Sequence, residues 1–281
     1  MNHAVRRKYC AVPALLIVVC AAPLRAQATD PEPLAQDPGS RTSQSPDDGT
    51  RTVTFMPRTA FHLDAEHLSG DDPRYAWDAD FGGELDVVDY GSGRFTFLAN
   101  YQVVLGEEIR SFDPNQGNYI LAGFVSARIR QTEVAAQLYH QSRHLADRPK
   151  EEAIDWNMLG LRALRRFSYR QAVFDARADA RGVFMKTTVD YSWEIDAGVR
   201  SDMKIRPRVG LLAVGDIRYL GVDGSLERGN QTGYRVEGGV RFEGDAGAIE
   251  LFVGGERRID PYPVEFGIAE WVTVGFRLLT R

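Results

Sequence analysis

The sequence predicts an all-β chain that folds as a transmembrane antiparallel β-barrel of about twelve strands. Three observations support this prediction: an amino-terminal export signal, long segments in which apolar and polar residues alternate, and connections that alternate between short and long. After the signal, no segment has the length and apolarity of a transmembrane helix. Strands are therefore the elements that we expect to cross the membrane.

The export signal occupies residues 1–28. A positively charged start at residues 6–8 is followed by the short apolar run 11–19, and small residues at 26–28 indicate cleavage after Ala28. Export of this kind predicts that the mature chain leaves the cytoplasm.

The mature chain is expected to consist of two parts. Residues 29–50 are rich in Pro, Asp, Ser and Gly and nearly lack large apolar side chains, so we expect a disordered periplasmic segment, and residues 51–281 are expected to form the barrel. Both cysteines, Cys10 and Cys20, lie in the signal, which excludes a thiolate nucleophile and a cysteine metal site in the mature chain. The net charge of -5, with both signs mixed along the chain, gives no indication of a nucleic-acid partner.

Strict alternation is clearest in residues 77–87. Trp77, Phe81 and Leu85 share one face of this segment, and acidic residues occupy the other. The pattern lasts about ten residues, which is longer than the usual globular strand and suits a tilted strand crossing a bilayer. The same alternation recurs in 95–105, 119–129, 191–199, 209–219, 234–242 and 272–278, and more weakly near 58–67, 133–142, 155–165, 169–177 and 247–257. An even strand number is typical of single-chain bacterial outer-membrane barrels.

The connections between these segments form a second pattern. Short links are expected near Tyr90–Gly93, Arg130–Thr132, Arg165–Ser168, Ser201–Arg206 and Gly244–Gly247, and longer ones near 68–74, 106–117, 143–154, 178–188, 221–232 and 258–265. Outer-membrane barrels have short periplasmic turns and longer extracellular loops. The alternation therefore predicts a barrel in the outer membrane of a Gram-negative bacterium, with both chain ends in the periplasm.

Charges of both signs fall on the expected inner face. They include Asp78, Asp80, Glu84, Arg128, Arg162, Glu194, Asp196, Arg200, Arg235, Glu237 and Arg241. Because the signs are mixed, they do not form a single-sign ring that selects ions. We expect them to pair across a narrow, filled lumen, which favours a structural interior over a selective channel.

Reactive residue types gather in the segment 138–147, LYHQSRHLAD. The apolar face of this strand includes Leu138, and the same parity continues to His140 and Ser142, so both are expected to face lipid near the outer-leaflet boundary. In the following strand the apolar parity extends back to Asn157. A hairpin symmetric about its loop places Asn157 opposite Ser142 and diagonal to His140.

This arrangement predicts a catalytic set of Ser142, His140 and Asn157. His140 takes the proton from Ser142 Oγ, Asn157 fixes the imidazole, and the hydroxyl attacks the acyl ester of a lipid. The expected partners are outer-membrane lipids.

The residues Tyr139-His140-Gln141-Ser142 resemble the H-x-S of outer-membrane phospholipase A. The resemblance implies a lipid-facing His and Ser with an Asn from the next strand, and it makes calcium a candidate cofactor and a homodimer a candidate assembly. Lipid A 3-O-deacylases carry a similar outward H-x-S. The phospholipase motif continues Asn-Gly-Arg, whereas this chain has Arg143-His144-Leu145. The resemblance therefore implies roles for His140, Ser142 and Asn157 only.

The run 140–148 is more similar to H-x-S-S-H-L-G-D-E, which marks a family of bacterial outer-membrane barrels of unknown function. The similarity extends from about Gly106 through Phe167. It implies a barrel and supplies no activity.

The sequence leaves open whether the chain is an enzyme. A phospholipase A-like or lipid A deacylase-like serine hydrolase stands against a non-enzymatic structural barrel or narrow channel, in which the basic residues of 143–150 simply contact lipid phosphates. A metal site from His140, His144 and Asp147 is a third interpretation, although its spacing matches no metal-binding signature. The roles of His144 and Asp147 are not determined by the sequence.

Overall fold

The computed structural model describes residues 53–146, 148–149 and 152–280. Within these residues the chain forms twelve strands: β1 (Thr54–Leu68), β2 (Trp77–Asp89), β3 (Arg94–Gly106), β4 (Asp113–Ile129), β5 (Thr132–Leu145), β6 (Ile154–Tyr169), β7 (Ala172–Thr187), β8 (Tyr191–Arg206), β9 (Val209–Val222), β10 (Gln231–Glu243), β11 (Gly247–Ile259) and β12 (Ile268–Thr280). The predicted signal peptide and the expected disordered segment 29–50 lie outside the described residues.

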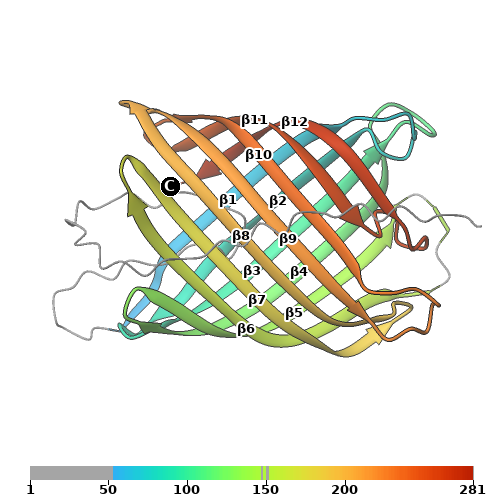
Figure 1. Ribbon diagram of the computed structural model, residues 1–281, viewed down its shortest axis with the longest axis horizontal. Coiled ribbons are helices and arrows are strands. Elements are labelled where there is room, and N and C mark those ends of the chain that lie inside the picture. Colours follow the sequence, from blue (N-terminus) through green and yellow to red (C-terminus); the bar gives the residue numbers. More distant parts are fainter. Residues whose placement is uncertain (1–52, 147, 150–151, 281) are drawn as a thin grey trace, which may run out of the picture. The chain divides into compact units, whose positions relative to one another are not determined.

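The strands form one closed antiparallel barrel. Each strand pairs with its neighbours in sequence, and β1 pairs with β12 to complete the ring. The strands run at a slant around the barrel (Figure 1). In the part of the chain that the structure describes, no helix is long and apolar enough to cross a membrane. The predicted fold class is confirmed.

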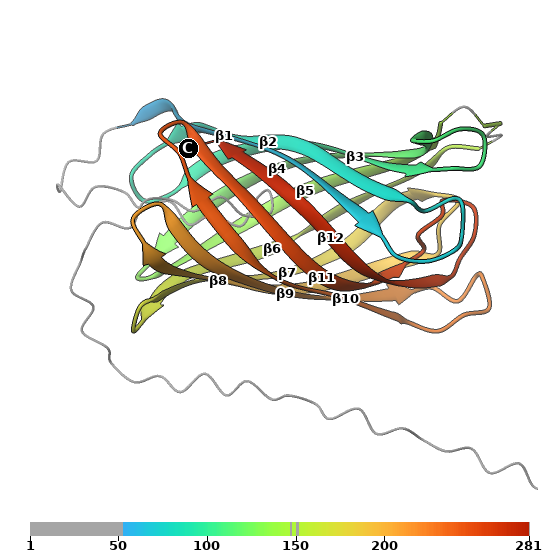
Figure 2. The same ribbon diagram turned by 90° about the horizontal axis from the view of Figure 1, so that it is seen from above.

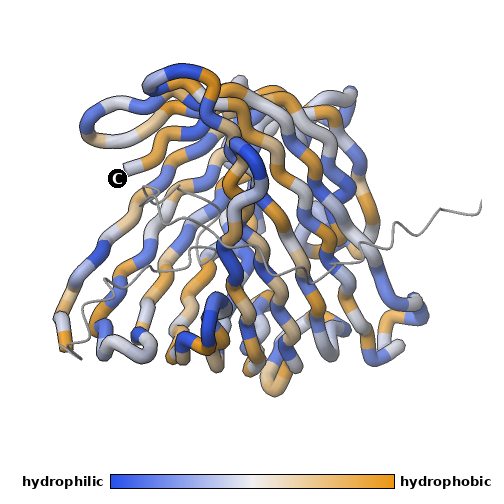
Figure 3. Tube along the Cα trace, turned by 60° about the vertical axis from the view of Figure 1, so that its left-hand side comes forward, coloured by the Kyte–Doolittle hydropathy of each residue, from blue (hydrophilic) through white to orange (hydrophobic). Residues whose placement is uncertain are grey.

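Hydrophilic and hydrophobic residues follow one another closely along the strands of the wall (Figure 3). On β6, for example, Leu159 and Leu161 are 56% and 61% exposed, whereas the neighbouring Arg162 is 5% exposed inside the barrel. A closed barrel with an apolar exterior and a charged interior matches lipid outside and paired polar groups inside, and it leaves no strand edge unpaired in the bilayer. The chain is therefore a barrel of the outer membrane, as predicted.

The pairing of β1 with β12, the seam that closes the barrel, is short compared with β1 itself. The pairing of β1 with β12 covers His62–Leu68, whereas its pairing with β2 begins at Thr54. Beyond the paired stretch, the Phe61 amide donates a hydrogen bond to Thr280 Oγ1 at 2.8 Å. The carboxyl-terminal strand thus lies beside β1 (Figure 2).

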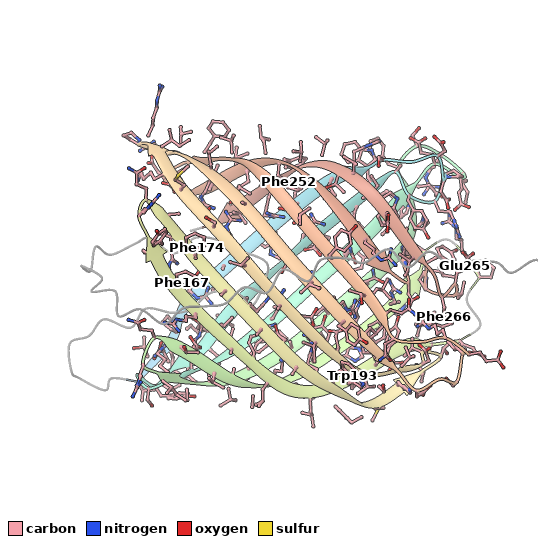
Figure 4. All side chains as sticks on the ribbon, in the orientation of Figure 1. Phe167, Phe174, Trp193, Phe252, Glu265 and Phe266 are labelled. Carbon is pink, nitrogen blue, oxygen red and sulfur yellow. The ribbon has the colours of Figure 1, made fainter. Side chains whose placement is uncertain are left out.

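The predicted turn at 165–168 is wrong, because β6 continues through these residues. The chain turns at 170–171, where Arg170 has a φ of 55°. Across this hairpin Phe167 stacks on Phe174, with ring centroids 5.1 Å apart (Figure 4). The polar residues that suggested a turn are strand residues, and one of them, Arg166, pairs with buried Asp175 inside the barrel at 3.8 Å.

Three further links differ from expectation. The link predicted near 106–117 is limited to 107–112, because β4 begins at Asp113. The predicted long link 178–188 is strand through Thr187, and the connection is limited to 188–190. The predicted turn 201–206 belongs to β8, and the chain turns at 207–208. Because 188–190 is shorter than the link 90–93, the strict short and long alternation fails at this loop. The remaining long links, 69–76, 107–112, 146–153, 223–230 and 260–267, exceed all the short ones.

The lumen is crossed by ion pairs, as predicted. Glu250 is fully buried and accepts hydrogen bonds from Arg200, Arg241 and Arg277. The Arg277 guanidinium also lies over the ring of inward-facing Phe252, 4.9 Å from its centroid (Figure 4). A cavity of about 320 Å³ remains between such pairs. The interior is therefore a charge-paired filling.

Apolar side chains pack inside the wall near the end of the barrel that carries the longer links. One buried cluster consists of Ile154, Trp156, Met158, Val189, Tyr191, Leu220 and Ile259. Above it, Arg228 from the link 223–230 pairs with Asp190 at 2.6 Å and Asp260 at 2.7 Å. These contacts tie the link 223–230 to both neighbouring links.

Candidate active site on the outer wall

The outward side of β5 carries three polar residues in succession at every second position. His140, Ser142 and His144 share this side, while the alternate residues Gln141 and Arg143 are buried in the barrel. Parity in a strand fixes this division. The prediction that His140 and Ser142 face outward is therefore confirmed by the geometry.

Arg143 takes no part in this outer cluster. Its Nε donates to Asn118 Oδ1 at 3.2 Å and its Nη1 donates to the Asp260 carbonyl at 2.6 Å, both within the barrel. The alternative in which Arg143 contacts lipid phosphates is thus wrong. Arg148 pairs with Asp113 at 2.8 Å, and Lys150 lies outside the described residues.

His140 and Asn157 are brought together directly. They are paired residues of β5 and β6, and His140 Nδ1 lies 2.9 Å from Asn157 Oδ1. An amide oxygen can only accept, so Nδ1 carries the hydrogen and the neutral ring presents its lone pair at Nε2. This is the tautomer that a general base needs when its other nitrogen is held by an orienting group.

Asn157, the predicted pairing partner of Ser142, is wrong: the residue that pairs with Ser142 lies two positions earlier in the chain. Ser142 pairs with Asp155, and Asn157 pairs with His140. A hairpin symmetric about the predicted link 143–154 in fact brings residues 142 and 155 together, as observed, so the expected opposition of Ser142 and Asn157 was displaced by two residues. The difference moves Asn157 from a diagonal position to the position directly opposite the imidazole.

His144 is the residue that sequence reasoning missed. It was expected in the loop, but it belongs to β5, and its Nε2 lies 3.3 Å from Ser142 Oγ. Its ring meets Tyr119 edge-on, with centroids 5.2 Å apart. Among the described side chains, the histidine in contact with Ser142 is thus His144, while Asn157 holds His140. Extending the parity by one more step would have revealed it.

Polar residues continue beyond Ser142 on the next two strands. Asp155 pairs with Thr187 of β7, and Thr187 Oγ1 donates to Asp155 Oδ2 at 2.6 Å. The hydroxyl of Ser142 therefore lies at the border of a small polar patch on the outer wall.

No metal centre emerges from the residues that the structure describes, since none of their His, Cys, Asp and Glu side chains form a group of three suited to an ion. Asp147, the third ligand in the metal interpretation, is not among them. The candidate site is thus a serine, two histidines and an amide.

Comparison with known proteins places the fold. No protein-family model and no curated protein matches the chain. Among solved structures, the Salmonella typhi outer membrane phospholipase dimer with bound calcium is similar, with a TM-score of 0.51 and 12% identity, covering 85% of this chain and 94% of that one. An outer membrane channel from Pseudomonas putida F1 has a TM-score of 0.49 and 14% identity, covering 85% and 99%. LpxR from Salmonella typhimurium has a TM-score of 0.46 and 8% identity, covering 79% and 99%. At such identities the phospholipase likeness concerns the fold: this chain has the architecture of outer-membrane β-barrels.

Proposed function

We propose that the protein hydrolyses acyl esters of outer-leaflet lipids, with Ser142 as nucleophile, His140 as general base and Asn157 as the group that orients the base. The observation that carries the proposal is the 2.9 Å contact between His140 Nδ1 and Asn157 Oδ1 on the lipid-facing wall. An apolar side chain would suit that wall better than either polar group. A chemical role explains why the pair is there.

The position of Ser142 suits an ester bond. It lies near the extracellular end of β5, where the strand leaves the apolar belt. In a bilayer the acyl esters of a lipid lie at the border between the hydrocarbon and the headgroups. The serine is thus at the level at which a lipid presents its ester.

The reaction proceeds by nucleophilic acyl transfer. Ser142 Oγ forms a bond to the ester carbonyl carbon while its proton passes to His140 Nε2. Collapse of the tetrahedral intermediate breaks the bond to the lipid alkoxide, which takes that proton and leaves as the lyso-lipid alcohol. Water, deprotonated by His140, then attacks the acyl-serine. The bond from the acyl carbon to Ser142 Oγ breaks, the proton passes from His140 to Ser142 Oγ, and the fatty acid leaves.

The test is release of fatty acid from phospholipid in detergent micelles by the purified full chain. Because the phospholipase neighbour is a dimer with bound calcium, the assay is run with calcium and with chelator, and at protein concentrations above and below dimer formation. We expect release by the wild type and loss of release in Ser142→Ala. Ser168→Ala, an exposed serine at the other end of β6, is the matched control and should keep full activity.

No release under any of these conditions, or equal release by Ser142→Ala, contradicts the hydrolase. The filled, ion-paired lumen then favours the structural barrel over the channel, and conductance above baseline in planar bilayers would contradict that alternative in turn.

A further inference from the structure

A continuous row of outward, directly paired residues crosses the wall through Ser142. From β2 to β7 its members are Phe81, Tyr101, Tyr119, Ser142, Asp155 and Thr187, each paired with the next. Strands lie about 4.8 Å apart, so the part of the row from Ser142 to Phe81 is about 14 Å long. The row is aromatic on one side of the serine and polar on the other.

The aromatic side forms a ladder of touching rings. Phe81 meets Tyr101 with centroids 5.3 Å apart, Tyr101 meets Tyr119 at 4.6 Å, and Tyr119 meets His144 at 5.2 Å. Tyr101 lies flat against the wall because residue 117 is glycine: a Cβ there would lie 2.3 Å from the Tyr101 hydroxyl oxygen. The rings thus form a continuous row of edge-on and tilted aromatic contacts that leads to the serine.

The row also changes depth in the membrane. Strands of such barrels are tilted, so a row perpendicular to them climbs around the wall. Tyr101 lies about midway along β3, Ser142 lies near the extracellular end of β5, and Thr187 is the last residue of β7. The aromatic residues therefore lie farther from the strand ends than Asp155 and Thr187 do, so the polar side of the row is the one nearer the headgroups.

We infer that this row is the track on which the substrate lies, with the acyl chain along Tyr119, Tyr101 and Phe81, the ester at Ser142 and the headgroup at Asp155. The polarity of the row follows that of a lipid from end to end. Asp155 is an anionic acceptor whose local partner is the Thr187 hydroxyl, so it favours a headgroup that offers N–H donors and positive charge. The substrate class is therefore a long-chain phospholipid with an ammonium headgroup. This inference rests on the proposed function.

The first test compares substrates of different chain length. We measure kcat/KM for dipalmitoyl phosphatidylethanolamine in micelles and for p-nitrophenyl acetate in the same mixture. Tyr101→Ala removes one of the rings that contact the acyl chain, so it should lower the ratio of long-chain to short-chain kcat/KM about tenfold. Tyr219→Ala, which removes an outward tyrosine in ring contact with Trp193 on β8 and β9, should keep the wild-type ratio.

The headgroup end is tested in the same assay. Asp155→Asn should reduce the preference for phosphatidylethanolamine over phosphatidylglycerol. If Ser142→Ala abolishes hydrolysis but Tyr101→Ala and Asp155→Asn keep both ratios, the track is overturned and the hydrolase stands.

A second measurement does not depend on hydrolysis. An ether-linked phosphatidylethanolamine with a diazirine in its acyl chain is crosslinked to the full chain at low lipid mole fraction, and the labelled residues are mapped by mass spectrometry. We expect more label on Phe81, Tyr101 and Tyr119 than on Trp193 and Tyr219. Equal labelling of the two faces overturns the track, and enriched labelling by an inactive protein supports it while overturning the hydrolase.

Discussion

The inner and outer walls of the barrel hold their polar side chains in different ways. Inside, His62 is buried and its Nε2 lies 2.6 Å from the carboxylate of Asp80. Outside, His140 is half-buried and meets the neutral amide of Asn157. The inner pair belongs to a network that compensates buried charge, whereas we expect that apolar residues could replace the outer pair without loss of stability. The two walls therefore predict opposite mutational behaviour.

The largest expected effect is on the outer wall. His140→Ala should lower fatty-acid release by about a hundredfold to ten-thousandfold, because general base catalysis contributes that much. The apparent stability in detergent should not fall.

His144→Ala is the matched control for this substitution, since both histidines lie two residues from Ser142 on one face. A smaller loss is expected, because Asn157 orients His140. If His144→Ala instead causes the larger loss, the base assignment is reversed.

On the inner wall the effect is on folding. Glu250→Ala leaves Arg200, Arg241 and Arg277 without their shared carboxylate, and removing one partner of a buried pair costs about 3–5 kcal/mol. Urea unfolding in lipid vesicles measures this loss in the free energy of unfolding.

The control is Arg257→Ala, which breaks the more exposed pair with Glu270 and should cost less than about 1 kcal/mol. Equal losses for the two variants would show that the inner charges do not act as a compensated network.

Asn157→Leu should separate activity from stability. Loss of the amide oxygen lets the imidazole turn, and misorientation of a catalytic group costs about a hundredfold. A leucine facing lipid should leave unfolding unchanged. Unfolding at markedly lower urea would instead assign the amide a structural role.

The smallest expected effect is a loss of stability in the link 69–76 at low pH. The hydrogen bond from Arg74 holds the pKa of Asp72 below its ordinary value of 3.8. The interaction is therefore fully present above that value and is lost as the pH falls through the lowered pKa. Because Asp72 is exposed, we expect less than about 1 kcal/mol.

Hydrogen exchange of residues 69–76 measures this loss: it should increase, relative to the intrinsic rate, between about pH 5 and pH 2. Asp72→Asn should remove that increase, and an unchanged increase in the variant would contradict the assignment.

The fold is readable in the sequence because the two walls demand opposite polarity at successive residues. On β6, for example, the side chains of Leu159 and Leu161 suit only the outer wall, and the side chain of Arg162 suits only the inner wall. Turns are less readable. The polar residues at 165–168 suggest a turn, yet Arg166 has a partner inside the barrel, and contacts of this kind depend on strands far along the chain or on the finished hairpin.

The candidate site could be predicted from the sequence to the same extent as the fold. Parity places His140 and Ser142 on one face, because the strand period is two. The opposition of His140 and Asn157 is the register of a hairpin symmetric about the predicted link 143–154, so it could also have been predicted by counting outward from that link. His144 was assigned to the loop because the apolar residues of this face end at Leu138, although the same parity continues through His140 and Ser142 to His144.

The seam between β1 and β12 has a consequence for assembly. Every other pairing joins strands that are consecutive in the chain, but this one brings together residues from its two ends, such as His62 and Leu279. Closing a long loop carries a larger entropic penalty, so it is expected late, once the hairpins have formed a curved sheet. Until then β1 and β12 are free edges, and an insertion factor that pairs with such edges would hold the open sheet until the two ends of the chain meet.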